Sequence, residues 1–157
     1  MSNLTPEKML KRTTEYAKNL AKAKSGYVAV GLPSEKVGGK AYGNGMTIIR
    51  VGAIHEYGLG HNPRRSFLNT PFDSKMDELS KAIGQQFEDV FKGKNVEVAL
   101  GLIGATATNI SKGAFTTRGY GVWPDIKAST KQSKGSSQVL IDKGLLRGAI
   151  TYSVRGV

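Results

Sequence analysis

A segment with strong helical periodicity, 70–93, constrains the fold of this chain most. Thr70 is the expected N-cap, Pro71 occupies the first helical position, and Gly93 follows the last apolar residue. The apolar positions recur at spacings of three and four: Phe72, Met76, Leu79, Ile83, Phe87, Val90 and Phe91. This pattern predicts an amphipathic helix whose apolar stripe belongs to the core and not to a cofactor site.

A second helix is expected directly after it, over 95–113. Asn95 is its N-cap, and apolar residues form one stripe up to Gly113. Gly101 and Gly104 lie inside this helix and each weaken it by roughly 1 kcal/mol relative to alanine. We expect these glycines to permit close packing against a neighbouring element.

The N-terminal part predicts a helix, two strands and a loop. Thr5 and Pro6 begin a basic helix within 1–25, whose polar face either is simply solvated or contacts DNA or an acidic partner. Residues 27–32 predict a strand, 33–45 a flexible glycine-rich loop, and 46–51 a second strand antiparallel to the first.

The C-terminal part contains a long polar segment and a final strand. Residues 116–138 predict a flexible loop with the single tryptophan, Trp123, which either anchors the loop locally or inserts into a partner. The alternation of Ile150, Tyr152 and Val154 with polar residues predicts a half-buried strand. The expected fold is therefore a single α+β domain over 1–157, with a small antiparallel sheet packed by two or three helices.

Composition excludes several classes of protein. The chain has 157 residues, no cysteine and a formal net charge of +11. The absence of cysteine excludes disulfide scaffolds, thiol nucleophiles and cysteine-ligated metals. No apolar run approaches the about 18 to 20 residues that span a bilayer, so no membrane partner is expected. Both ends of the chain are basic, which makes polyanions plausible neighbours.

Motifs for catalysis, metals and cofactors are missing. His55-Glu56 begins like a zinc-protease helix motif, but Leu59 occupies the position of the second histidine. There is no P-loop, no Gly-x-Ser-x-Gly elbow and no Ser-x-x-Lys pair. We therefore expect neither an enzyme nor a bound cofactor or metal.

The segment 52–73, GAIHEYGLGHNPRRSFLNTPFD, gathers an acid, aromatic residues and paired arginines before the best helix. Glu56 can pair with Arg64 or Arg65 inside the chain and brace the loop. Alternatively, the same pair can lock neighbouring subunits of a ring, because a heterologous interface repeats one contact at every seam.

This segment resembles the A-x-x-H-E-F-G…P-x-R-P-F signature of tail-completion and neck proteins of tailed bacteriophages, which join the head to the tail during virion morphogenesis. Trp123-Pro124 and LIDKGLLRGAI at 140–150 resemble the C-terminal pattern of the same family, in the same order. The chain departs from the family at Ser66, where proline is usual, at Lys143, where threonine is usual, and at Gly148-Ala149.

The resemblance implies a structural protein of the virion, assembled in the host cytoplasm, with no catalysis. It implies a ring of identical subunits, expected to be a hexamer, at the neck between the head connector or stopper and the tail tube. The residues expected at subunit or partner contacts are His55, Glu56, Tyr57, Arg64, Arg65, Trp123 and Asp142. The loops 33–45 and 116–138 would become ordered on docking.

The positive charge suits a channel crossed by DNA, which would be held through its phosphates without sequence preference. The alternative function is a basic, sequence-independent nucleic-acid-binding protein. That alternative predicts salt-dependent affinity for DNA by a monomer or dimer, whereas the neck function predicts affinity for connector or tail components.

Overall fold

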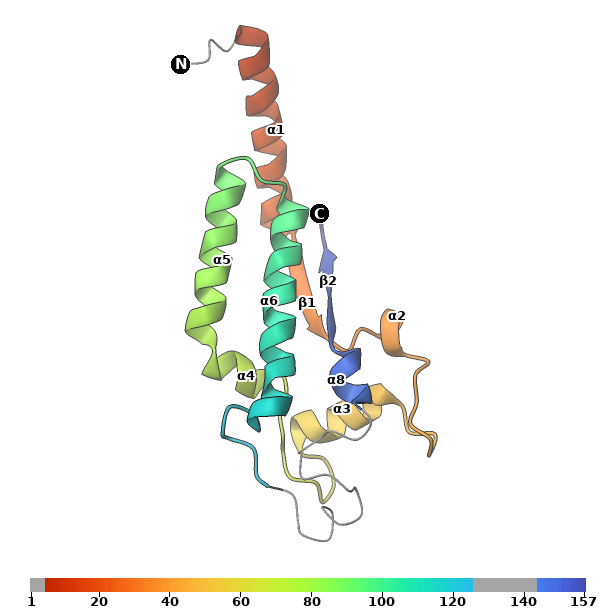
Figure 1. The fold of residues 1–157 in the computed structure, drawn as a ribbon. Coiled ribbons are helices and arrows are strands. Elements are labelled where there is room, and N and C mark those ends of the chain that lie inside the picture. Colours follow the sequence, from red (N-terminus) through yellow and green to blue (C-terminus); the bar gives the residue numbers. More distant parts are fainter. Residues whose placement is uncertain (1–4, 126–143) are drawn as a thin grey trace.

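The computed structural model describes residues 5–125 and 144–157 and is mostly helical with a small antiparallel sheet, an α+β fold (Figure 1). The described elements, in chain order, are α1 (Pro6–Ser25), β1 (Tyr27–Gly31), α2 (Ser34–Val37), α3 (Ile48–Tyr57), α4 (Asn69–Ser74), α5 (Met76–Phe91), α6 (Val96–Thr117), α8 (Leu145–Ala149) and β2 (Thr151–Arg155). Among the described helices, none is long and apolar enough to cross a membrane.

Helix α6 is the centre of the fold and contacts α5, α4, α1 and both strands. Strands β1 and β2 pair antiparallel, with Tyr27 opposite Arg155 and Gly31 opposite Thr151. The sheet approaches α6 closely at Gly104, where an added Cβ would lie 2.4 Å from the Tyr152 ring. This confirms the expected role of Gly104 in close packing.

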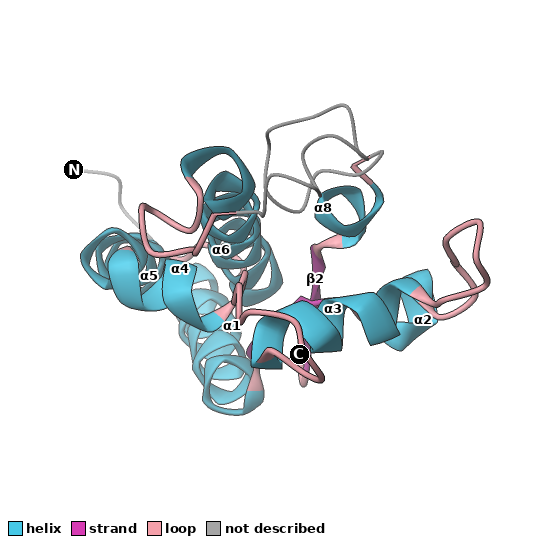
Figure 2. Cartoon of the chain, turned by 90° about the horizontal axis from the view of Figure 1, so that it is seen from below, coloured by secondary structure: helices cyan, strands magenta, loops and turns pink. Residues whose placement is uncertain are grey.

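Two apolar clusters lie at opposite ends of α6. The larger joins the C-terminal end of α6 to α3 and α8, and α3 lies across this lower end of the molecule (Figure 2). Its buried members are Val37, Ile48, Phe67, Ala114, Phe115, Trp123, Leu146, Ala149 and Ile150. The smaller is formed by Val90, Val96 and Ala99 between α5 and α6.

Helix α1 begins as predicted, with the Thr5 hydroxyl accepting a hydrogen bond from the backbone N–H of Lys8. It has 20 residues, none of them buried, and extends beyond the rest of the molecule (Figure 1). Ala23, near its C-terminal end, packs against the cluster between α5 and α6. Most of α1 is therefore a solvent-exposed projection.

The predicted strand 46–51 is wrong, because this segment begins helix α3. The Thr47 hydroxyl accepts from the backbone N–H of Arg50 and caps the helix. Ile48, Gly52 and Glu56 then recur every four residues on the buried face. The run of β-branched residues indicated a strand, but tertiary packing of that face outweighs local β-propensity. The partner of β1 is instead the C-terminal strand β2.

The predicted helix 70–93 is divided in two. Lys75 leaves helical geometry, with φ −124° and ψ 25°, and separates α4 from α5. Thr70 is not the N-cap, since it lies inside α4 and its N–H donates to the Ser66 hydroxyl. The expected helix at 95–113 has its Asn95 cap but continues to Thr117.

The predicted loops differ from the structure in part. Within 33–45, residues 34–37 form helix α2. Within 116–138, the first two residues belong to α6, and residues 118–125 form turns that return to the core. Residues 126–138 lie outside the described residues, as do 140–143 of the C-terminal motif.

Candidate functional site

The Glu56 carboxylate is the centre of the site formed by the first motif. The side chain is 5% exposed, and α3 directs it toward the segment that precedes α4. Oε1 accepts from the Ser66 hydroxyl at 2.7 Å and from the Asn69 N–H at 3.2 Å. Oε2 accepts from the N–H groups of Phe67 and Leu68 at 2.8 and 3.0 Å. One carboxylate therefore satisfies three backbone donors around the start of α4.

Ser66 completes this arrangement. Its hydroxyl donates to Glu56 and accepts from the Thr70 N–H at 3.1 Å, so it caps α4 from outside the helix. Ser111, on α6, donates to the Phe67 carbonyl at 2.6 Å and fixes the same segment from the other side. Sequence reasoning treated Ser66 only as a departure from the family and missed Ser111. The signal available for Ser66 was a hydroxyl side chain four residues before Thr70, the residue that the sequence placed at the start of the helix.

The second motif meets the first at Arg65 and Trp123. The buried Arg65 side chain donates from Nε to the Pro124 carbonyl at 3.0 Å and from Nη2 to the Asp125 carbonyl at 2.9 Å. Burial lowers the pKa of Arg65, and the charge of Asp125 opposes this effect. Trp123 donates from Nε1 to the Ser66 carbonyl at 2.8 Å. We call Glu56, Arg65, Ser66, Phe67 and Trp123 the motif junction.

Aromatic packing supports the motif junction. The Trp123 ring meets Phe115 edge-on at a centroid distance of 5.4 Å, and Phe115 lies 5.8 Å from Phe67. Trp123 is 6% exposed, so in this structure it anchors its loop inside the chain.

The predicted pairing of the Glu56 carboxylate with Arg64 or Arg65 within the chain is wrong, because neither arginine donates to this carboxylate in the structure. The carboxylate is occupied by donors at the start of α4, whereas Arg65 turns to the carbonyls of 124–125. Arg64 does brace the loop, but its Nε donates to the backbone carbonyl of Glu56 at 3.1 Å. Backbone donors at a helix start lie closer to the carboxylate than either guanidinium.

The remaining predicted site residues lie in different environments. Tyr57 is 67% exposed, and Arg64 is also exposed. They flank a tight turn that begins at Gly58, where φ is +69° and Arg64 backbone atoms approach within about 3 Å of an added Cβ. His55 is half-buried, and Asp142 lies outside the described residues. Of the predicted set that the structure describes, Tyr57 and Arg64 are the exposed members.

The junction is built for structural support. Its carboxylate, hydroxyl, guanidinium and indole N–H all make hydrogen bonds within the chain. Over residues 5–125 and 144–157, no group of three or more His, Cys, Asp or Glu side chains is arranged to hold a metal ion. What the site can do is hold two distant segments together and present the 57–64 turn at the surface.

Comparisons with protein-family models, with curated proteins and with solved structures found no match to this chain. The family resemblance therefore depends on the motif residues alone.

Proposed function

We propose that this protein is a structural subunit of a tailed-phage virion. In this role it forms a ring at the neck, expected to be a hexamer, and joins the tail to the head connector or stopper. The subunit contributes binding surfaces and no catalysis. Its partners are copies of itself, the connector side of the neck and the tail-tube side.

The observation that carries this proposal is the contact between the two motifs. The residues that resemble the family signature at 56–67 and at 123–124 are far apart in sequence but share hydrogen bonds in one buried junction. Both segments therefore belong to one buried structural unit, and the resemblance to the family concerns that unit and not two separate surface stretches.

Exposed apolar groups around the turn support an assembly role. Tyr57 is 67% and Leu59 49% exposed, and Arg64 lies beside them. Tyrosine and arginine are enriched at the centres of protein interfaces. A heterologous ring would place this turn against a different surface of the next subunit at every seam. The sheet has only two strands in the described structure, so its outer edges can also accept a neighbouring strand.

The test is electron microscopy of lysates from the phage that carries this gene, with an early stop codon introduced. We expect filled heads with unattached tails, or tails of abnormal length. Normal infectious particles would refute the neck function.

Complementation then tests the surface. A plasmid-borne Tyr57→Ala, Arg64→Ala double variant loses the hydrogen bond from Arg64 to the Glu56 carbonyl, so its melting temperature is expected to fall by about 2–4 °C. The variant is expected to remain folded but to fail to restore joined particles. Lys81→Ala, an exposed change on α5, is the matched control and is expected to restore them. Full rescue by the double variant would exclude the 57–64 turn as an assembly surface.

A second candidate function is sequence-independent nucleic-acid binding. The specific observation that favours it is a basic groove beside α1, lined by Arg12, Lys18, Lys22 and Lys92. Salt-dependent DNA affinity of the isolated protein, together with normal particles from the stop-codon phage, would make this the leading function.

A further inference from the structure

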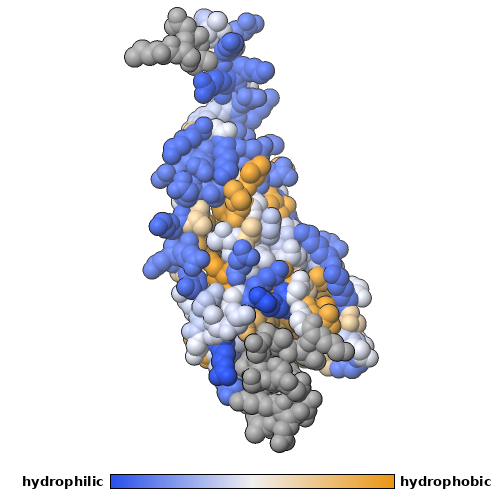
Figure 3. Space-filling model, viewed as in Figure 1, coloured by the Kyte–Doolittle hydropathy of each residue, from blue (hydrophilic) through white to orange (hydrophobic). Residues whose placement is uncertain are grey.

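A groove of about 760 Å³ separates α1 from the turn between α5 and α6. Four cationic side chains line it: Arg12, Lys18 and Lys22 from α1, and Lys92 from the turn. One carboxylate, Glu15, faces them, so the lining carries an excess of three positive charges. The face of the projecting part of α1 that Figure 3 shows is mostly hydrophilic. The groove therefore attracts anions.

The cations of the groove are weakly engaged within the chain. Lys92 pairs with Glu88 at 3.5 Å, but both side chains are about 70% exposed, and such a pair contributes little stability. In the part of the chain that the structure describes, Arg12, Lys18 and Lys22 form no ion pair. These charges remain available for a ligand.

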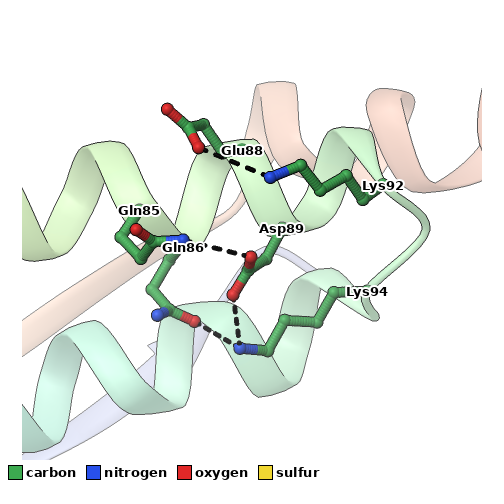
Figure 4. A network of polar contacts seen from close by, with 6 residues as sticks. All are labelled: Gln85, Gln86, Glu88, Asp89, Lys92 and Lys94. Atoms are coloured by element: carbon green, nitrogen blue, oxygen red, sulfur yellow. Dashed lines mark hydrogen bonds and ion pairs between the residues drawn. The ribbon is translucent and has the colours of Figure 1, made fainter.

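The neighbouring Lys94 shows the contrast. Its Nζ donates to Gln86 at 2.6 Å and to Asp89 at 3.2 Å, and these contacts tie the turn to α5 (Figure 4). Lys94 is only 27% exposed and belongs to the structure of the turn, whereas Lys92 extends along its surface. Lys94 therefore stabilises the turn, whereas the Lys92 side chain is exposed beside the groove.

Two aromatic side chains also line this basic groove. Phe91, the last residue of α5, is 57% exposed, and Tyr16 of α1 is half-buried. An exposed phenylalanine leaves apolar area in contact with water, which is unfavourable by about 25 cal/mol per Å². The core clusters do not use the Phe91 ring.

We propose that this groove binds single-stranded nucleic acid. The phosphates contact Arg12, Lys18, Lys22 and Lys92, and an unpaired base stacks on Phe91. Basic grooves with interspersed aromatic rings are the usual surfaces for single strands, because every base has a face that can stack. A duplex would engage the same cations, but its bases already stack on one another and would leave Phe91 without a partner. This inference specifies the ligand of the second candidate function, on whose groove it rests, and it does not depend on the assembly role.

Fluorescence anisotropy of the full-length protein tests this proposal. The probes are a labelled oligothymidylate of about 12 nucleotides, which is within the size range of single-strand sites, the matching duplex, and an oligouridylate of the same length. We expect the single strands to bind more tightly than the duplex, and the tighter of the two single strands identifies the nucleic acid. Duplex binding that equals or exceeds single-strand binding refutes the proposal, as does the absence of binding at low salt.

Variants separate the two kinds of contact. Phe91→Ala is expected to weaken single-strand binding by about 5- to 150-fold, the range measured for loss of one stacking ring. It should leave duplex binding unchanged, and Phe91→Tyr should retain affinity. Met76→Ala is the matched control, because Met76 is a 50% exposed apolar residue on the same helix. Equal affinity of Phe91→Ala and wild type would overturn the stacking contact.

The double variant Lys18→Ala, Lys22→Ala tests the phosphate contacts. For single strands, the slope of log affinity against log salt is expected to fall in magnitude by about 1.4. Lys81→Ala, on the exposed side of α5, should leave the slope unchanged. An unchanged slope in the double variant places the phosphates elsewhere and refutes the proposed groove. Because the assay uses the isolated protein, its outcome is independent of the particle assembly experiment.

Discussion

Replacing Glu56 by glutamine tests whether the motif junction stabilises the fold. The substitution preserves the size of the side chain but replaces one carboxylate oxygen by an NH₂ group, which cannot accept. The four hydrogen bonds to Glu56 are shared equally between its two oxygens, so at least two donors lose their acceptor. Each buried donor without a partner costs about 1–3 kcal/mol.

The expected loss is therefore about 4 kcal/mol in the free energy of unfolding. For a chain of this length, 1 kcal/mol corresponds to about 2–4 °C in melting temperature, so we expect a decrease of about 8–16 °C. Urea and thermal unfolding followed by far-ultraviolet circular dichroism measure both quantities. Glu15→Gln, the same chemical change at an exposed position of α1, is the control and should change stability by less than about 0.5 kcal/mol.

A double-mutant cycle with Ser66→Ala sharpens the test. Because the Ser66 hydroxyl donates to the carboxylate at 2.7 Å, the two substitutions should be non-additive by at least about 0.5 kcal/mol. A Glu56→Gln protein within about 0.5 kcal/mol of wild type would refute the capping role of this carboxylate. Additive effects in the cycle would refute its coupling to Ser66.

The remaining predictions concern helix packing and acid stability. Gly104→Ala should destabilise the protein by about 1–3 kcal/mol, because the new Cβ would lie 2.4 Å from the Tyr152 ring. Gly84→Ala has open space around the new Cβ and should instead stabilise the protein by about 0.5–1 kcal/mol. Urea unfolding measures both effects. The hydrogen bond from Lys94 holds the pKa of Asp89 below its ordinary value of 3.8. The stabilisation from this pair is present above that ordinary value and is lost as pH falls through the lower, folded-state pKa, so Asp89→Asn should show a shallower loss of stability in acid than wild type. The same dependence of the free energy of unfolding on acidic pH in both proteins would contradict this effect.

Local signals predicted several elements correctly. Thr5 and Asn95 are helix caps in the structure, and the alternating residues at the C-terminus form strand β2. These elements depend on interactions between residues close in sequence, such as a side-chain oxygen that accepts from an N–H two or three positions later. All the residues that form such an interaction lie within a few positions of each other, so a short stretch of sequence is enough to predict it.

Segments with competing signals were predicted incorrectly. The β-branched residues of 46–51 favour a strand locally, but packing of Ile48 and Gly52 against the larger core selects α3. The break at Lys75 and the anchoring of the start of α4 by Glu56 and Ser66 were not predicted either. Neither the apolar spacing nor the Thr70-Pro71 pair carries information about those distant donors and acceptors.

The sequence by itself determined the α+β class, the helices α1 and α6, most of α5, and the residues of both motifs. Only the tertiary structure decided that Glu56 serves backbone donors, that Arg65 and Trp123 join the second motif to the first, and that Phe91 lies in a basic groove. The physical reason is range. Caps and periodicity act over one or two helical turns, whereas a buried carboxylate, an indole or a groove obtains its partners from segments that only the complete fold brings together.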